Sequence, residues 1–109
     1  MISRLLCVAA AMSLTAGTPA LADLATSIKT GKTVCTRATY VDKDRISCKV
    51  LAAKKIILLA MQSNYEDNRK GCASLARLLL HPDLKLDPGW SLVLKNTVID
   101  RDKVVSCRF

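Results

Sequence analysis

The chain has 109 residues and a formal net charge of +8 at pH 7, with 17 Lys and Arg against 9 Asp and Glu. The length allows one domain and excludes a chain of several domains. A single histidine and four aromatic residues (one Trp, two Tyr, one Phe) leave little material for an acid–base centre or for a site that stacks nucleic-acid bases.

The first 22 residues have the features of a secretory signal. Arg4 is the only charged residue, residues 5–14 are apolar or small apart from one serine, and the sequence Ala-Leu-Ala ends at Ala22. The apolar run is too short for a transmembrane helix, which needs about 20 residues. We therefore predict cleavage after Ala22, no transmembrane segment, and a single domain over residues 23–109 that is periplasmic or secreted.

Cleavage removes Cys7 and leaves four cysteines, namely Cys35, Cys48, Cys72 and Cys107. An even number of cysteines in a short exported chain is typical of a disulfide framework. The gaps of 13, 24 and 35 residues lack the close pairs of a zinc site and the C-x-x-C of a redox site, so no metal is expected. Three pairings are open. A hairpin over residues 33–50 would bring Cys35 to Cys48, which favours Cys35–Cys48 and Cys72–Cys107.

The N-terminal part of the mature chain predicts a short helix followed by a hairpin. Asp23 is a candidate N-cap and Gly31 a candidate end for the helix. The segment "TVCTRATYVDKDRISCKV", residues 33–50, is rich in Val, Thr, Tyr and Ile on both sides of a polar turn, which favours two antiparallel strands.

The middle of the chain predicts a buried strand and a helix. Residues 52–62 are compatible with strand or helix, and the compact apolar run over residues 56–61 favours a central strand buried on both faces. In the next segment, Ser63 and Glu66 form a capping-box pattern, and Pro82 stops the helix.

Two strands complete the chain, over residues 90–95 and 105–109, after an Asp-Pro-Gly turn. We therefore predict an α+β domain, with one main helix packed on an antiparallel sheet of four to five strands.

Two segments resemble each other: "VDKDRISC" over residues 41–48 and "IDRDKVVSC" over residues 99–107. Shared turn chemistry and two similar hairpins are our interpretation. A calcium site is the alternative, because both segments contain Asp-x-Asp. Both lack the glycine and late glutamate of a calcium loop and have basic residues between the acids. We expect no cofactor.

No set of residues in the sequence predicts catalysis. The only histidine, His81, precedes a proline at a helix end, and there is no G-x-S-x-G motif or phosphate-binding glycine loop. We expect a protein that is not an enzyme. An enzyme centred on His81 is a weaker alternative.

The positive charge indicates an acidic protein or an anionic envelope surface as the partner, although a solvated basic surface without a partner is the alternative. Nucleic acid is not expected in an exported protein with few aromatic residues. Our leading hypothesis is a non-catalytic exported binding module. The second is an inhibitor or immunity-type protein that blocks an exported enzyme through the segment "HPDLKLDPG", residues 81–89. The candidate contact residues are Lys54, Lys55, Arg69, Lys70, His81, Asp83, Lys85 and Trp90.

Overall fold

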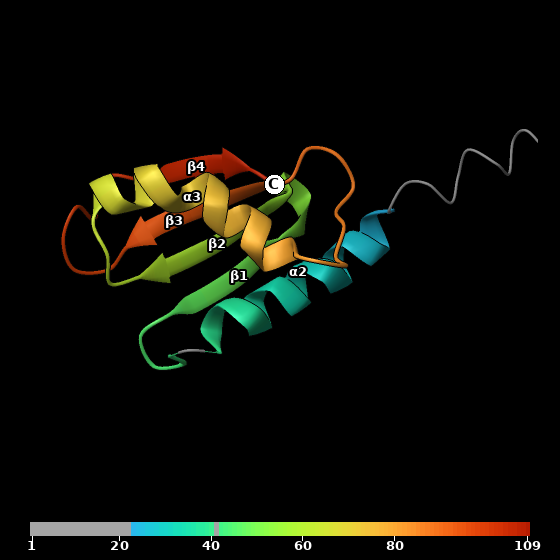
Figure 1. The fold of residues 1–109 in the computed structure, drawn as a ribbon, viewed down its shortest axis with the longest axis horizontal. Coiled ribbons are helices and arrows are strands. Elements are labelled where there is room, and N and C mark those ends of the chain that lie inside the picture. The colour runs from blue at the N-terminus through green and yellow to red at the C-terminus, as the bar shows by residue number, and fades with distance from the viewer. Residues whose placement is uncertain (1–22, 41) are drawn as a thin grey trace, which may run out of the picture.

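A computed structural model describes residues 23–40 and 42–109 (Figure 1). The predicted signal peptide, residues 1–22, lies outside the described residues, so its cleavage stays a prediction. The elements in chain order are helix α2 (Leu24–Thr39), β1 (Ser47–Leu51), a short 3-10 turn η1 (Ala52–Lys54), β2 (Ile56–Met61), helix α3 (Tyr65–Leu80), β3 (Ser91–Asn96) and β4 (Val105–Arg108). None of the helices among these residues has the length and hydrophobicity needed to cross a membrane.

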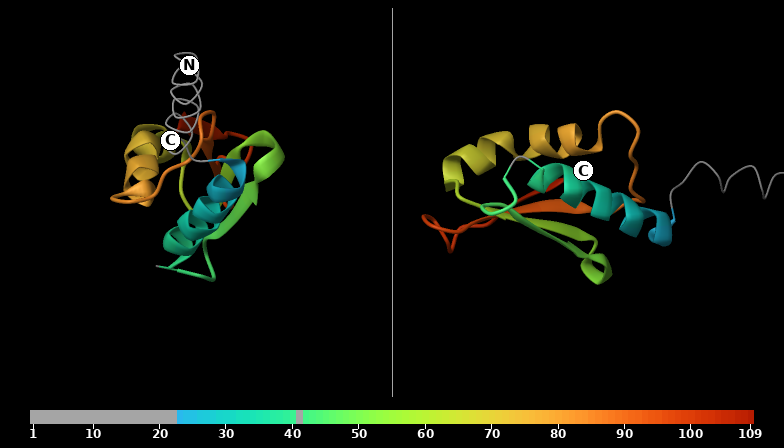
Figure 2. Two further views of the ribbon diagram at one scale, coloured as in Figure 1. Left: turned by 90° about the vertical axis from the view of Figure 1, so that its right-hand side faces the viewer. Right: turned by 90° about the horizontal axis from the view of Figure 1, so that it is seen from below.

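The fold is the predicted α+β class, with a four-stranded sheet in the order β1-β2-β3-β4. The outer pairs are antiparallel, and the central pair β2–β3 is parallel, which differs from the antiparallel sheet we expected. Helix α3 joins β2 to β3 and carries the chain back to the starting end, as a parallel pair requires. Both helices, each of 16 residues, cover the same face of the sheet (Figures 1 and 2).

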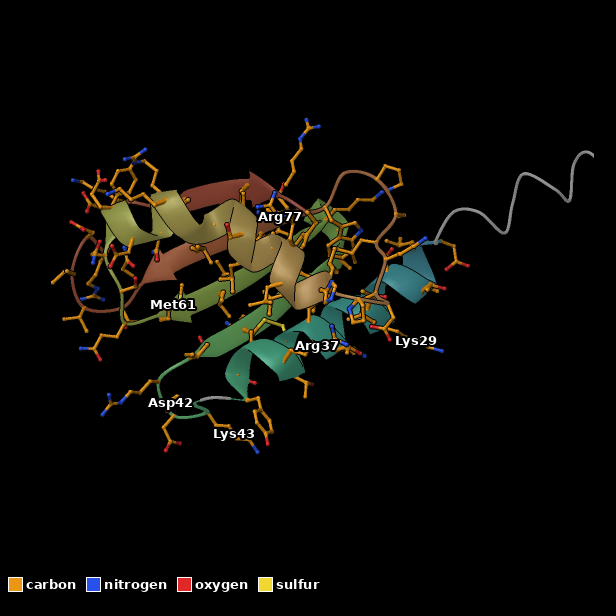
Figure 3. All side chains as sticks on the ribbon, in the orientation of Figure 1. Lys29, Arg37, Asp42, Lys43, Met61 and Arg77 are labelled. Atoms are coloured by element: carbon orange, nitrogen blue, oxygen red, sulfur yellow. A yellow bond between two sulfur atoms is a disulfide. The ribbon has the colours of Figure 1, made fainter. Side chains whose placement is uncertain are left out.

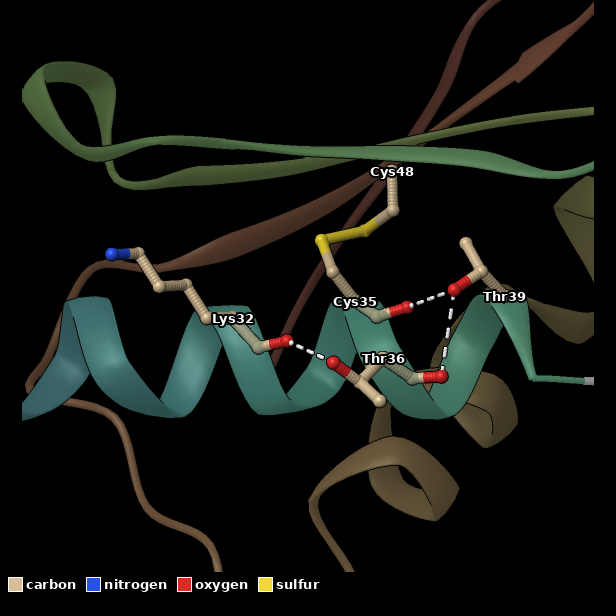
Figure 4. The surroundings of a disulfide bond; sticks show 5 residues. All are labelled: Lys32, Cys35, Thr36, Thr39 and Cys48. Carbon is tan, nitrogen blue, oxygen red and sulfur yellow. Dashed lines mark hydrogen bonds between the residues drawn. A yellow bond between two sulfur atoms is a disulfide. The ribbon is translucent and has the colours of Figure 1, made fainter. Parts of the chain in front are cut away.

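Helix α2 begins where the short helix was predicted, after Asp23, but continues through residues 33–39, which we predicted as part of the first strand of a hairpin. Threonine usually favours strands, but here the hydroxyls of Thr33, Thr36 and Thr39 donate to backbone carbonyls four residues earlier and so fit the helix. Figure 4 shows these bonds for Thr36 and Thr39. The predicted hairpin over residues 33–50 is therefore wrong. Asp23 does cap the helix, because its Oδ1 accepts a hydrogen bond from the Thr26 N–H at 2.7 Å.

Gly31 lies inside α2 and does not end it. A Cβ atom at this position would come within 3.1 Å of both γ-carbons of Val50 on β1. The buried side of α2 is made of small residues, Ser27, Thr30, Gly31 and Val34. The helix can therefore lie very close to the sheet.

Helix α3 matches the predicted helix, with a different cap. Asn64 is the N-cap, and its Oδ1 accepts from the Asp67 N–H at 2.9 Å; Ser63 does not take this role. Glu66 accepts a hydrogen bond from Arg69 at 2.8 Å, one turn further along the helix. The helix ends at Leu80, just before Pro82, where the sequence predicted its end.

The core lies between the helices and the sheet and consists of Val34, Ile57, Leu59, Cys72, Ala76, Leu79, Trp90, Leu92, Leu94 and Val105. Both favoured disulfides are present: Cys35–Cys48 joins α2 to β1, and Cys72–Cys107 joins α3 to β4. Each edge strand of the sheet is thus crosslinked to one of the two helices; Figure 4 shows the Cys35–Cys48 bridge.

Candidate functional site

The face of the sheet opposite the helices is not covered by any helix or strand that the structure describes (Figure 2). Along β2 and β3, Ile57, Leu59 and Leu92 point to the helices and are buried. The alternate residues point to the other side, where no described helix or strand lies (Figure 2). The prediction that β2 is buried on both faces is thus wrong, because Ile56 and Leu58 are only half-buried and do not pack against the core.

This surface, which we call the open face, has an apolar centre and basic residues around it. The strand register places Leu58 between Lys49 and Val93. Lys49, Lys95 and Arg108 are exposed on three different strands. The residues of the open face are Ser47, Lys49, Leu51, Ile56, Leu58, Ala60, Ser91, Val93, Lys95, Ser106 and Arg108. None of them is acidic, so the open face can attract carboxylates around an apolar contact.

Two of the predicted contact residues, Lys55 and Trp90, instead hold Asp87. Lys55 has a left-handed backbone (φ 54°), and its Nζ donates to Asp87 Oδ2 at 2.5 Å and to the Pro88 carbonyl at 2.9 Å. The Trp90 Nε1–H donates to Asp87 Oδ1 at 2.7 Å. Trp90 is only 2% exposed, so it belongs to the core and is not available to a partner.

Asp87 is also bound to helix α2. Its backbone N–H donates to the Ser27 hydroxyl at 2.7 Å. The Lys55 ammonium, followed by the side-chain hydroxyl of Ser27, lowers the pKa of the Asp87 carboxyl from 3.8 to about 2 by favouring its charged form. The Asp87 cluster therefore connects α2, the start of β2 and the segment before β3, and its role is structural.

The predicted residues His81 and Asp83 lie beside Arg37 of α2, which sequence reasoning missed. Arg37 Nη1 donates to the carbonyls of Leu79 and His81 at 3.0 and 2.9 Å, and Nη2 lies 3.4 Å from Asp83 Oδ1. Figure 3 shows Arg37 on α2 beside the C-terminal end of α3. This cation satisfies carbonyl groups at the C-terminal end of α3. The segment over residues 81–89 is consequently held at its start by Arg37 and at its end by the Asp87 cluster.

The remaining predicted residues do not gather with these groups. Arg69 and Lys70 are exposed on α3, Lys54 is exposed between β1 and β2, and Lys85 is exposed in the segment before β3. The predicted set is thus spread over separate parts of the surface. The cations of the open face were missed, although alternation along the strands was the signal that could have found them.

The two similar sequence segments enter the sheet at the same end. The first, residues 42–46, connects a helix to β1, so our interpretation of two hairpins is wrong for it; the second lies in the β3–β4 connection. The strand directions make β1 and β4 parallel to each other, so both connections lie at one end of the sheet (Figure 1).

A cavity of about 350 Å³ lies between these connections, lined by Lys43, Asp44, Arg45, Ile46, Ser47, Ala60, Gln62 and Thr97. Its charges are of both signs, and Arg45 is paired with Asp42 at 3.5 Å. Over residues 23–40 and 42–109, no group of three or more His, Cys, Asp or Glu side chains is arranged to hold a metal ion.

Comparison of the chain with protein-family models, curated proteins and solved structures found no match. No relative therefore assigns a role to any of these residues.

Proposed function

We propose that the protein is an exported, non-catalytic binding module that holds an acidic protein partner on the open face. The observation that carries the proposal is the apolar centre around Leu58 and Val93, bordered by Lys49, Lys95 and Arg108 without an acid among them. Contiguous apolar surface with a polar border is typical of interaction sites.

The chemistry of the open face favours a protein with acidic and apolar groups. The centre needs an apolar complement, because its side chains gain free energy only by leaving water. The surrounding cations need carboxylates, and such pairs increase the association rate and the specificity. A second copy of the same face is disfavoured, because it would oppose cations to cations.

Export and the lack of catalysis rest on separate support. Two disulfides fit an oxidising compartment, and with the predicted signal they favour the periplasm or the outside of the cell. The four cysteines of the described chain are bonded, and the Asp87 carboxyl, whose pKa is lowered, is already occupied by Lys55 and Trp90. Neither the four cysteines nor the Asp87 carboxyl therefore provides a free nucleophile or base.

The inhibitor hypothesis has one observation in its favour. The segment over residues 81–89 is held at both ends, by Arg37 and by the Asp87 cluster, while His81, Asp83 and Lys85 are exposed. A preformed exposed loop loses little entropy when it enters an enzyme cleft.

Site-specific photo-crosslinking in the parent cells tests the proposal. A photoreactive amino acid at Ser106 on the open face should capture one protein, and the same group at Ser74 on the outer side of α3 should not. Capture from Lys85 instead would favour the inhibitor hypothesis. Combined Lys49→Glu, Lys95→Glu and Arg108→Glu substitutions should abolish capture from Ser106, while Lys70→Glu, an exposed control, should not change it.

Capture that survives the triple substitution would contradict the role of the open face. Intact mass of the exported protein, with and without reduction, would at the same time determine whether the chain begins at Asp23 and contains two disulfides.

A further inference from the structure

The connection between β3 and β4, residues 97–104, carries exposed aliphatic side chains at one end of the molecule. Val98, Ile99 and Val104 are 57%, 54% and 52% exposed. This 97–104 loop extends beyond the end of the sheet (Figures 1 and 2). Large aliphatic residues gathered on a protruding loop are unfavourable in water and indicate a contact that removes them from it.

The loop is held in its shape by hydrogen bonds. Asn96 Nδ2 donates to the Asp100 carbonyl at 3.3 Å, and the Lys103 N–H donates to the same carbonyl at 3.0 Å. The Asp100 carboxylate accepts from the N–H of Tyr65, the first residue of α3, at 2.9 Å. Asn96 is itself fixed by the buried side chain of Asn68 at 2.7 Å. The aliphatic side chains are thus presented by an ordered loop, which lowers the entropic cost of binding.

The charges of the loop suit an anionic surface. Arg101 and Lys103 are exposed beside the aliphatic residues. The Asp100 carboxylate lies at the N-terminus of α3, where the helix dipole offsets its charge. The 97–104 loop has two acids and two bases, but the Asp100 carboxylate is turned toward α3, so the exposed charges of the loop are the two cations and Asp102.

We propose that the 97–104 loop inserts into the surface of a bilayer that contains anionic lipid. Val98 and Ile99 enter the boundary between headgroups and acyl chains, and Arg101 and Lys103 meet the lipid phosphates. This is how interfacial segments combine apolar contact with attraction to anionic headgroups. A convex apolar tip favours a bilayer over a protein, since lipid needs no matching pocket. The loop is separate from the open face and would leave that face free for a protein partner.

Sedimentation with lipid vesicles tests this proposal on the exported protein with its disulfides formed. The wild-type protein should bind vesicles of phosphatidylcholine with 30% phosphatidylglycerol more tightly than pure phosphatidylcholine. Val98→Ser combined with Ile99→Ser should weaken the binding at least tenfold. Leu78→Ser removes a comparably exposed side chain from α3 (69% exposed) and should leave the binding unchanged.

Two further variants separate charge from apolar contact. Arg101→Gln combined with Lys103→Gln should weaken binding to the anionic vesicles by about fivefold per charge, whereas Asp102→Asn should strengthen it. All these side chains are exposed, so the urea midpoints of the variants should lie close to the wild type; only Lys103→Gln should cause a small decrease, because the Lys103 Nζ lies 5.5 Å from the centroid of the Tyr65 ring. That measurement separates an effect on binding from an effect on folding.

Two outcomes would overturn the proposal. One is an equal loss of binding with Leu78→Ser. The other is no binding of the wild-type protein to either vesicle; photo-crosslinking from Val104 to a protein would then assign the loop to a protein contact instead. The Lys49→Glu variant of the open face should leave vesicle binding unchanged, so the failure of either proposal can be recognised without the other.

Discussion

Removal of the Cys72–Cys107 disulfide should destabilise the protein more than removal of Cys35–Cys48. The two bridges close loops with sequence separations of 35 and 13 residues. In the chain-entropy model these separations correspond to about 4 and about 3 kcal/mol of stability. Cys72 is also only 2% exposed, so its replacement by Ala adds a packing loss in the core. The expected difference between the two double-alanine variants is therefore about 1 kcal/mol or more.

Urea unfolding gives a direct assay for both variants. Trp90 is the only tryptophan and is buried, so its fluorescence reports the loss of the core. In a domain of this size, each kcal/mol lowers the melting temperature by about 4–8 °C. The variant without Cys72–Cys107 should thus melt roughly 15–30 °C below the wild type. Arg108→Ala, an exposed neighbour of Cys107, is the control and should change stability by less than about 0.5 kcal/mol.

A reversed order of the two variants would refute this reasoning. So would a loss of less than about 1 kcal/mol from each, because loop closure would then not be the main contribution of the bridges.

Five other substitutions test the fold at single contacts. Asn68→Ala should lower the free energy of unfolding, measured in urea, by about 1–3 kcal/mol, because it leaves the buried Asn96 side-chain carbonyl without its donor. The double variant with Asn96→Ala should lose less stability than the sum of the two single variants. Because the pKa of Asp87 is lowered in the folded protein, its carboxylate stabilises the fold above pH 4, and this contribution is lost as the pH falls from about 4 to about 2. Asp87→Asn should therefore lower the free energy of unfolding at pH 7. The same variant should also flatten the pH dependence of stability between about pH 4 and about pH 2. Gly71→Ala should raise the free energy of unfolding by about 1 kcal/mol, because the new Cβ meets nothing within 4 Å. Gly31→Leu should lower it by about 1–3 kcal/mol, because the larger side chain overpacks against β1. Thermal melts in which Gly71→Ala destabilises and Gly31→Leu stabilises the protein would contradict the packing described for the two helices.

Much of the C-terminal half of the fold could be predicted from sequence, because its signals are local. A cap residue, charged residues in the first helical turn and a terminal proline delimit α3 within one or two residues. The disulfide pairing was also correct, although the reason was not: Cys35 lies near Cys48 because a helix packs on a strand, rather than because two strands pair.

The first half of α2 was predicted as a short helix, but its second half was missed because the threonines and the valine there favour strands on average. The deciding signal was a stripe of small residues at helical spacing, Ser27, Thr30, Gly31 and Val34, which fits a helix pressed against a sheet. The parallel pair β2–β3 could have been predicted, because a helix between two strands is the usual connection of parallel neighbours. The contacts of Arg37 could not have been predicted from the sequence, because they depend on where the end of α3 lies relative to α2.

The open face can be recognised only from two kinds of information together, the alternation of residues along the strands and the register between the strands. Alternation along β2 assigns Ile56 and Leu58 to one side, but only the register shows that Lys49, Lys95 and Arg108 surround an apolar centre. Apart from Trp90 and the residues of the segment 81–89, the candidate residues were selected from the sequence for their charge, and charge is spread over the whole chain. Their separation in space follows from that choice.

The basic residues of the open face have two possible roles, recognition of an acidic partner and protection against aggregation. A charge-reversal variant distinguishes the two roles. Charges on the edge strands β1 and β4 also oppose edge-to-edge aggregation. For that purpose the sign of the charge does not matter, so Lys49→Glu combined with Arg108→Glu should leave the protein monomeric and soluble. Recognition of an acidic partner does depend on sign, and the same variant should lose the partner captured from Ser106. A soluble double variant that still captures this partner would assign the cations to solubility alone, and one that aggregates would show that the positive charge itself protects the sheet.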